Sequence, residues 1–220
     1  MQRKIIVTGD GSSSLLVEKM GETFHSRHGA VQESVYVYID NGLKLIEKEE
    51  ISILEFGFGT GLNALLTAKH ALEHRLKIHY ETIEAYPLTV EEYSLLNYKD
   101  FVQTTISLQQ LHEILWATPS PVSLNNYFSI LKHPQKIEDF TTSRKFDLIY
   151  FDVFGYDYQP ELWNKEILQK TFDFLLPGGM LVTYACKGVV NRNLKEIGFE
   201  VRKLKGPPGK REMTLAVKNI

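Results

Sequence analysis

The chain has 220 residues, 43% of them hydrophobic, and a formal net charge of −2, which suits one well-packed domain with modest additions. This charge excludes nucleic-acid binding through a strong overall positive field, so any such contact must come from a local patch. The single cysteine, Cys186, excludes an internal disulfide and a cysteine-based metal cluster, and the seven histidines are scattered, so we expect no bound metal. Because no apolar run is long enough to span a bilayer, we expect a cytoplasmic protein.

Residues 1–45 do not follow the strand–helix alternation of the rest of the chain. We expect a strand at 5–8, a polar turn at 9–14 and a helix at 31–40 that ends at Asn41-Gly42. We interpret residues 1–45 as an N-terminal appendage that covers the functional site, and residues 46–220 as the main domain.

From residue 46 the elements alternate between strand and helix, which is typical of an α/β fold with a mostly parallel sheet. We expect strands that end at Glu55, at 77–84, 127–132, 146–152 and 180–185, and helices at 62–72, 90–96, 110–117, 164–175 and 189–197. Residues 118–126 are interpreted as a connection, and residues 176–179 as the stop between a helix and the strand that follows. Strands at 199–204 and 214–217 are expected to form an antiparallel edge pair, which makes seven strands in the sheet.

The most informative motif is Ile53-Leu-Glu-Phe-Gly-Phe-Gly-Thr-Gly61, an apolar strand that ends in an acid and continues into three alternating glycines. Such a turn is typical of S-adenosylmethionine binding in Rossmann-like methyltransferases, because glycines let the backbone approach a cofactor closely. A nicotinamide site would need glycine instead of Leu62. Glu55 could pair with a cationic cofactor. The alternative is an ordinary strand-to-helix turn that binds nothing.

A second acid, Glu84, ends the next predicted strand, and in a right-handed β-α-β unit this position lies beside the glycine turn. There it could accept hydrogen bonds from both ribose hydroxyls, although a solvated glutamate at a strand end is also common. We therefore expect the cofactor site to consist of Glu55, Gly57, Gly59, Thr60, Gly61, Asn63, Glu84 and Asp152.

Asp152 ends the apolar strand at 146–152 and is the predicted catalytic residue. Methyl transfer to an amine requires a free lone pair on nitrogen, and an aliphatic amine is mostly protonated at neutral pH. A carboxylate beside the cofactor could orient the ammonium and accept its proton. Asp152 could instead only cap the turn that follows the strand.

Further motifs carry a resemblance to one family. Phe151-Asp-Val-Phe-Gly-Tyr-Asp-Tyr-Gln-Pro-Glu-Leu-Trp163 resembles the D-A-F-x-P-x-x-N/Q-P-E-L-W signature of the tRNA 5-methylaminomethyl-2-thiouridine methyltransferases. The segments at 20–34, 176–188 and 206–213, with Lys210-Arg-Glu-Met213, are similar to the same family, so the resemblance extends over nearly the whole chain. Tyr156 replaces a proline common in the family, and His133-Pro-Gln-Lys136 replaces a Gly-Asp pair, which leaves the adenine contact unassigned.

This resemblance implies N-methylation of the 5-aminomethyl group of tRNA wobble uridine, with the anticodon stem-loop as partner. Phe154 and Tyr156 could stack on a splayed uracil or belong to the core. Lys187, Lys210, Arg211 and Glu212 are the other predicted substrate-binding residues, in a basic patch that could contact phosphates or form a solvated hairpin.

Two alternatives remain open from the residues alone. One is a small-molecule amine methyltransferase or an aminopropyltransferase, and the other is a non-catalytic RNA- or protein-binding module on the same fold. Cys186 is not expected to be a nucleophile, because a small buried cysteine is the usual case. The chain has no second dinucleotide-binding stretch, so a separate flavin-dependent enzyme is a possible source of the aminomethyl precursor.

Overall fold

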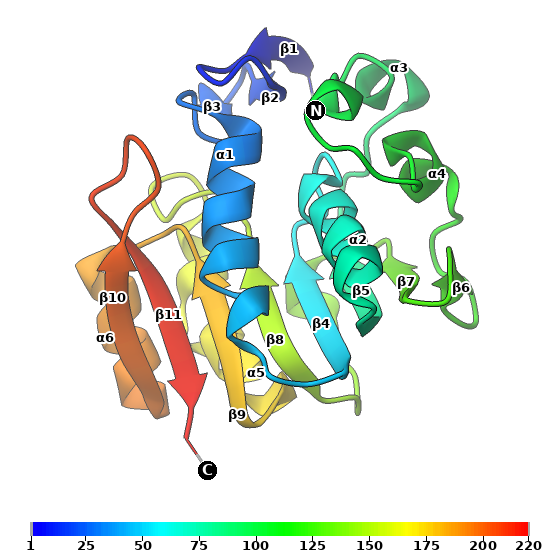
Figure 1. The fold of residues 1–220 in the computed structure, drawn as a ribbon. Helices are drawn as coiled ribbons and strands as arrows, with labels where there is room; N and C mark the ends of the chain where they lie inside the picture. The colour runs from blue at the N-terminus through cyan, green and yellow to red at the C-terminus, as the bar shows by residue number, and fades with distance from the viewer. Residues whose placement is uncertain (1, 220) are drawn as a thin grey trace.

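The computed structural model describes residues 2–219, which form two sheets and the helices around them (Figure 1). The large sheet has the order β10-β11-β9-β8-β4-β5-β7-β6, and the small sheet has the order β1-β2-β3. The strands are β1 (Arg3–Val7), β2 (Ser13–Val17), β3 (Glu22–Thr23), β4 (Glu50–Phe56), β5 (Lys77–Ile83), β6 (Val122–Ser123), β7 (Phe128–His133), β8 (Phe146–Phe151), β9 (Leu175–Thr183), β10 (Phe199–Lys205) and β11 (Glu212–Lys218).

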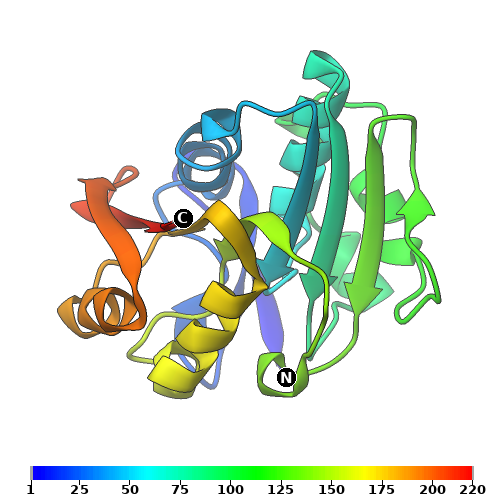
Figure 2. The same ribbon diagram turned by 90° about the horizontal axis from the view of Figure 1, so that it is seen from below.

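Helices cover both faces of the large sheet. They are α1 (Ala30–Ser34), which continues as a π-helix over Val35–Asp40, and α2 (Leu62–His74), α3 (Val90–Tyr93), α4 (Leu108–Glu113), α5 (Lys165–Phe174) and α6 (Gly188–Ile197). Figure 2 shows α1 and α5 on opposite sides of the sheet. Alternate residues of β4 point to the two sides, so Ile53 joins the hydrophobic cluster under α2 and Leu54 joins the cluster under α5 and α6.

The parallel strands explain how distant residues reach one site. Strand β4 pairs in parallel with β5 on one side and with β8 on the other. The chain therefore passes to both sides of β4, and the carboxyl ends of β4 and β8 lie next to each other. All six residues of β8 are buried, as expected for a central parallel strand, and the expected α/β fold is confirmed.

Strands β10 and β11 form the expected antiparallel pair at one edge of the sheet, with β11 next to β9. Two other details differ from the expectation. The sheet has eight strands instead of seven, because Val122–Ser123 in the predicted connection pairs with β7 as β6. The predicted stop at 176–179 is part of β9, and the register between β8 and β9 shifts there. A proline and two glycines can be accommodated in a strand where such an irregularity interrupts the pairing.

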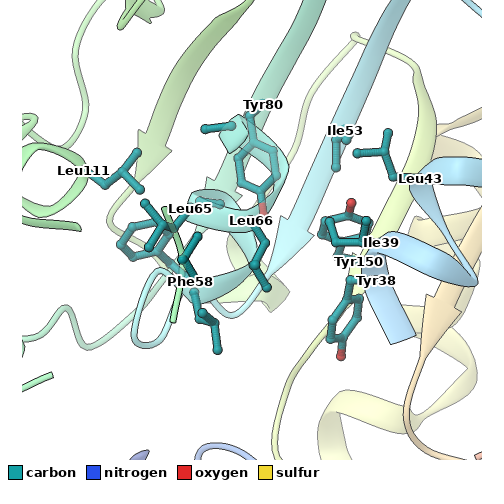
Figure 3. Close-up of a cluster of buried hydrophobic side chains, with 14 of the residues drawn as sticks. Tyr38, Ile39, Leu43, Ile53, Phe58, Leu65, Leu66, Tyr80, Leu111 and Tyr150 are labelled. Atoms are coloured by element: carbon teal, nitrogen blue, oxygen red, sulfur yellow. The ribbon is translucent and has the colours of Figure 1, made fainter. Parts of the chain in front are cut away.

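The helix at 30–40 belongs to the main core. Tyr38 and Ile39 pack in one cluster with Ile53 and Tyr150 of the sheet, and Leu43 follows in the same cluster (Figure 3). The rings of Tyr38 and Tyr150 are 5.1 Å apart. Within residues 2–45, strands β1–β3 form a separate sheet, although Leu15 of β2 joins the same hydrophobic cluster as Tyr38.

This packing predicts that Leu43→Ala lowers the free energy of unfolding by about 2–5 kcal/mol, because Leu43 is 1% exposed and its loss leaves a cavity. Leu45→Ala is the matched control two residues away, since Leu45 is 48% exposed and its truncation should change stability by no more than about 0.5 kcal/mol. Urea denaturation of both variants measures the difference. Equal, small effects would show that residues 30–45 are not part of the core.

Candidate active site

A cleft of about 220 Å³ lies at the carboxyl ends of the parallel strands. Its walls come from the turn after β4, from the residues that follow β5, β7 and β8, and from the small N-terminal sheet. Gly59, Glu84, Asp152 and Phe154 line it, and all four are predicted site residues. In open α/β sheets ligands bind where the order of the strands reverses, which is the position of this cleft.

The glycine turn after β4 is held tightly against the end of β8. Gly57 has φ 91°, and a Cβ atom on it would lie 2.4 Å from the backbone oxygen of Asp152. The backbone N–H groups of Gly57 and Phe58 both donate to the oxygen of Ile83, at 3.0 and 3.3 Å. Gly61, with φ 76°, is the N-cap of α2. Glycine at position 57 therefore permits an approach that a side chain would block.

The amide of Asn63 connects two acids from neighbouring strands. Its Nδ2 donates to Oδ2 of Asp152 at 2.8 Å and to Oε1 of Glu55 at 3.2 Å. Because Asn63 lies in the first turn of α2, this contact also fixes the helix to the ends of β4 and β8. One buried side chain thus joins the glycine turn to the predicted catalytic residue.

Glu55 lies behind the turn and does not line the cleft. It is 0% exposed, and its second oxygen accepts from Thr82 at 2.8 Å. Burial raises the pKa of Glu55 to about 8, which the hydrogen bond from Thr82 only partly offsets, so the group is protonated at neutral pH. The expectation that Glu55 pairs directly with a cationic cofactor is therefore not met by this geometry, because the side chain is neither charged nor accessible.

The side chain of Thr60 is also outside the cleft. Its Oγ1 accepts a hydrogen bond from Tyr98 at 3.1 Å and lies 3.4 Å from Nε2 of His25. The other ring nitrogen of His25 lies 3.1 Å from the hydroxyl of Ser14 on β2. Thr60 thus connects the glycine turn to the N-terminal sheet, and its predicted contact with the cofactor does not come from its side chain.

Glu84 lines the cleft, as its place at the end of β5 suggests. One carboxylate oxygen accepts from the backbone N–H of Gly59 at 3.0 Å, and the other accepts from that of Tyr86 at 2.8 Å. The carboxylate is therefore oriented by the glycine turn itself. It presents a hydrogen-bond acceptor next to the backbone of that turn.

Asp152 is the second acid that lines the cleft, and it keeps partial exposure toward it. Burial raises its pKa to about 6, and nearby hydroxyl and amide groups of Tyr38 and Asn63 oppose the rise. The hydroxyl of Tyr38 is buried close to the carboxylate, although it meets no acceptor with the geometry of a full hydrogen bond. Asp152 can therefore exchange a proton near neutral pH.

The N-terminal sheet adds residues that the sequence does not predict. The ring of Phe24 lies against Gly59 and packs edge-on against Phe154, with 5.3 Å between the ring centroids. Arg3 donates to the backbone oxygen of Tyr86 at 2.6 Å and pairs with Glu92 at 2.7 Å. Phe24 and Arg3 line the cleft from above, and strand patterning alone carries no signal for this contact.

The loop after β7 forms the opposite wall, with Gln135, Lys136, Ile137 and Glu138 lining the cleft. This segment includes the place where the sequence leaves the adenine contact unassigned. The loop is anchored by Glu81, which accepts from Nε2 of His133 at 2.8 Å and pairs with Arg144 at 2.7 Å.

The predicted substrate-binding residues do not form one surface. The side chain of Tyr156 is half-buried, and the ammonium of Lys187 lies 5.2 Å from its ring centroid while pairing with Asp157. Neither residue lines the cleft. Phe154 alone of the predicted aromatic stackers does so.

The two residues of the basic pair 210–211 have different surroundings. Lys210 turns inward, 2.5 Å from Oε1 of Glu33 and 3.6 Å from the ring centroid of Tyr184. Arg211 is exposed, and Glu212 pairs with Lys203 at 3.0 Å. The ammonium of Lys210 is therefore partly buried against a nearby acid and an aromatic ring, and its predicted contact with substrate phosphates stays a prediction.

Two other features of the described residues bear on function. His70 and His74 are one helical turn apart on α2, with ring centroids 4.2 Å apart. This H-x-x-x-H spacing is present in the sequence, so the interpretation that the histidines are scattered overlooks it. Within residues 2–219, no cluster of three or more metal-ligating side chains includes them. No helix in the same range is long and apolar enough to cross a membrane.

Known proteins are similar to this chain over most of its length. The chain is 30% identical over 223 residues to the tRNA 5-methylaminomethyl-2-thiouridine biosynthesis bifunctional protein MnmC of Actinobacillus pleuropneumoniae, covering 89% of this chain and 32% of that protein. Identity to the protein of the same name from Pseudoalteromonas translucida is 27%, over 88% of this chain and 33% of the relative. The chain thus spans about a third of the length of these relatives.

Solved structures show the same fold. The crystal structure of MNMC2 from Aquifex aeolicus matches with a TM-score of 0.78 and 26% identity, over 98% of this chain and 69% of that chain. Spermidine synthase from Thermotoga maritima matches with a TM-score of 0.62 and 14% identity, over 99% of this chain and 69% of that chain, which shows the fold alone. A family model described as S-adenosyl-L-methionine-dependent methyltransferase matches residues 94–219, and the chain belongs to this family.

Proposed function

We propose that this methyltransferase transfers a methyl group from S-adenosylmethionine to the 5-aminomethyl group of the wobble uridine in tRNA. The observation that carries the proposal is Asp152, a partly exposed carboxylate in the cleft that is joined through Asn63 to the glycine turn. The names of the relatives and the D-x-F motif that begins at Asp152 support the substrate.

The residues in the cleft fit the cofactor. Glu84 offers carboxylate oxygens for ribose hydroxyls, and Ile83, Ala85 and Ile137 supply apolar surface for a purine ring. Gln135 or Glu138 could contact the adenine amine from the loop after β7. When bound, the cofactor supplies an electrophilic methyl group on a sulfonium.

Asp152 would act on the acceptor. Its carboxylate binds the ammonium of the aminomethyl group and accepts one proton, so that an N–H bond breaks and a lone pair on nitrogen becomes available. That lone pair then forms the new N–C bond in line with the departing sulfur. Phe154, half-buried at the cleft beside Phe24, would contact the uracil ring.

Asp152→Asn is expected to reduce methyl transfer about 10²- to 10⁴-fold while leaving the fold and cofactor binding intact. The amide is nearly isosteric but cannot accept the proton. The assay follows labelled methyl groups into undermodified tRNA, with polyamines and acceptor-free mixtures in parallel. Transfer to polyamines instead of tRNA would identify a small-molecule enzyme, and no transfer at all would indicate a binding module.

The control for this variant is Asp173→Asn, an exposed acid on α5 outside the cleft, which should keep the wild-type rate. Raising the pH should partly rescue Asp152→Asn, because more of the amine is then deprotonated in solution. A wild-type rate for Asp152→Asn across the pH range would show that the carboxylate only caps the turn.

Glu84→Ala is expected to weaken cofactor binding about 5- to 150-fold, since two hydrogen bonds of about 0.5–1.5 kcal/mol each are lost. Glu84→Gln keeps one acceptor oxygen and should have an intermediate effect. Calorimetry with S-adenosylhomocysteine measures the affinities, and a thermal melt of each unliganded variant checks that the glycine turn is intact. Unchanged affinity in both variants would remove Glu84 from the site.

The exposed cations of the C-terminal hairpin are the proposed contact for tRNA phosphates, and Lys205 and Arg211 are exposed at the two ends of the loop that joins β10 to β11. The double variant Lys205→Ala/Arg211→Ala should raise KM for tRNA and lower the salt slope of binding by roughly 1 per lost phosphate contact. Lys77→Ala, at the opposite end of the sheet, is the control. An unchanged salt slope in the double variant would place the tRNA elsewhere.

A further inference from the structure

Lys210 forms a contact between the two ends of the chain. Its ammonium donates to Oε1 of Glu33 on α1, 177 residues away in the sequence, and it lies over the ring of Tyr184 at the end of β9. The side chain of Glu33 is 7% exposed and that of Lys210 is 30% exposed. The second oxygen of Glu33 accepts from the backbone N–H of Ser26 at 2.6 Å. Both members of the ion pair are thus oriented by further contacts.

The loop that carries Lys210 is closely packed. A Cβ atom on Gly206 would lie 2.5 Å from the backbone oxygen of Lys210, and one on Gly209 would lie 2.0 Å from the ring of His28. The backbone N–H of Lys210 also donates to the oxygen of Pro207 at 2.9 Å. Lys210 is therefore held by its own loop and by the segment around residue 28, unlike a freely moving surface lysine.

The ion pair lies behind the wall of the cleft that is next to Asp152. Tyr184 lines the cleft together with Asp152, and its hydroxyl donates to the backbone oxygen of Val153 at 2.8 Å. Lys210 covers the ring of this tyrosine. The pair thus reaches the lining of the cleft through the ring of Tyr184, whose hydroxyl binds the backbone of the residue next to Asp152. Charges at such a partly buried position are screened less than fully exposed ones.

The charged and titratable groups around Asp152 come from several elements. They are Glu33 and Tyr38 from the helix at 30–40, Glu55 from β4, Tyr80 from β5, Tyr98, Tyr184 from the end of β9, and Lys210 from the hairpin loop. Burial favours the protonated form of Asp152, Glu33 adds to this effect, and Lys210 opposes it. Lys210 is thus the cation that favours the ionised carboxylate needed to accept a proton.

We propose that Lys210 and Glu33 are positioning residues whose ion pair, braced by Tyr184, sets the electric field at Asp152 and thereby the pH range in which Asp152 accepts the proton of the acceptor amine. This inference rests on the proposed amine methylation. The proton passes from the ammonium nitrogen to a carboxylate oxygen of Asp152, and the pair itself neither gains nor loses a proton.

Variants of the two partners should move the activity profile in opposite directions. Lys210→Met removes the cation and leaves the charge of Glu33, so the acidic limb of the kcat profile should move up by about one pH unit. Glu33→Gln leaves the ammonium of Lys210 without a neutralising carboxylate, so the acidic limb of the kcat profile should move to lower pH. Lys210→Arg keeps the charge and should restore the wild-type profile. Arg202→Met, which removes an exposed cation paired with Glu200 in the same hairpin, should leave the limb in place.

A direct titration separates this inference from the proposed function. Carbon-13 NMR of aspartate-labelled protein gives the pKa of the Asp152 carboxyl in the free enzyme, with the signal identified by its loss in Asp152→Asn. We expect a higher pKa in Lys210→Met and a lower one in Glu33→Gln. If Lys210→Met does not fold, Lys210→Gln and Glu33→Gln provide the same comparison.

Opposite shifts of the Asp152 pKa in the two variants would support an electrostatic effect of the ion pair, because a purely structural role would shift this pKa in the same direction in both. Shifts in the same direction, or no shift in folded variants, would overturn the inference even if tRNA is methylated. If the wild-type enzyme methylates no tRNA, the proposed function fails, while the titration still tests the electric effect of the pair on Asp152.

Discussion

The hydrogen bonds of the Asn63 amide to two carboxyl groups are the interaction on which the rest of the site depends. Glu55 and Asp152 stand at the ends of adjacent parallel strands, and two ionised carboxylates so close together in a buried place would repel each other. The pKa of Glu55, raised to about 8 mainly by burial, keeps that group neutral. Asp152, with a pKa of about 6, can then carry the charge. Because Glu55 is neutral, no second negative charge beside Asp152 opposes the ionised form of that carboxylate.

The backbone makes this arrangement possible, and both ends of the chain complete it. The turn at Gly57 passes so close to residue 152 that no side chain would fit between them. The N-terminal sheet places Phe24 over the same turn, and the C-terminal hairpin brings Lys210 to Glu33. The cleft is therefore lined by the N-terminal segment and by residues that follow the central strands, and the C-terminal hairpin contacts this lining through Lys210 and Tyr184.

The positions of two acids that end apolar strands were predicted well. Glu84 and Asp152 end apolar strands, and parallel strands bring their carboxyl ends to one edge of the sheet, so both acids line the cleft as expected. Glu55 ends such a strand too, but its side chain points toward α2, where it binds Asn63, and it is fully buried. The helix at 30–40 was predicted as an element, yet its place in the main core was not, because amphipathic periodicity does not say which surface a helix covers.

The sequence by itself determined the α/β fold, the glycine turn and the membership in a methyltransferase family, because these follow from strand periodicity, glycine spacing and short motifs within a few residues of one another. Only the tertiary structure decided the directions of the charged side chains. Lys210 and Arg211 are neighbours with similar chemistry, and the first faces Glu33 and Tyr184 while the second is exposed. Which of two adjacent cations is partly buried depends on an acid and a ring brought there by the fold, and no local pattern records those partners.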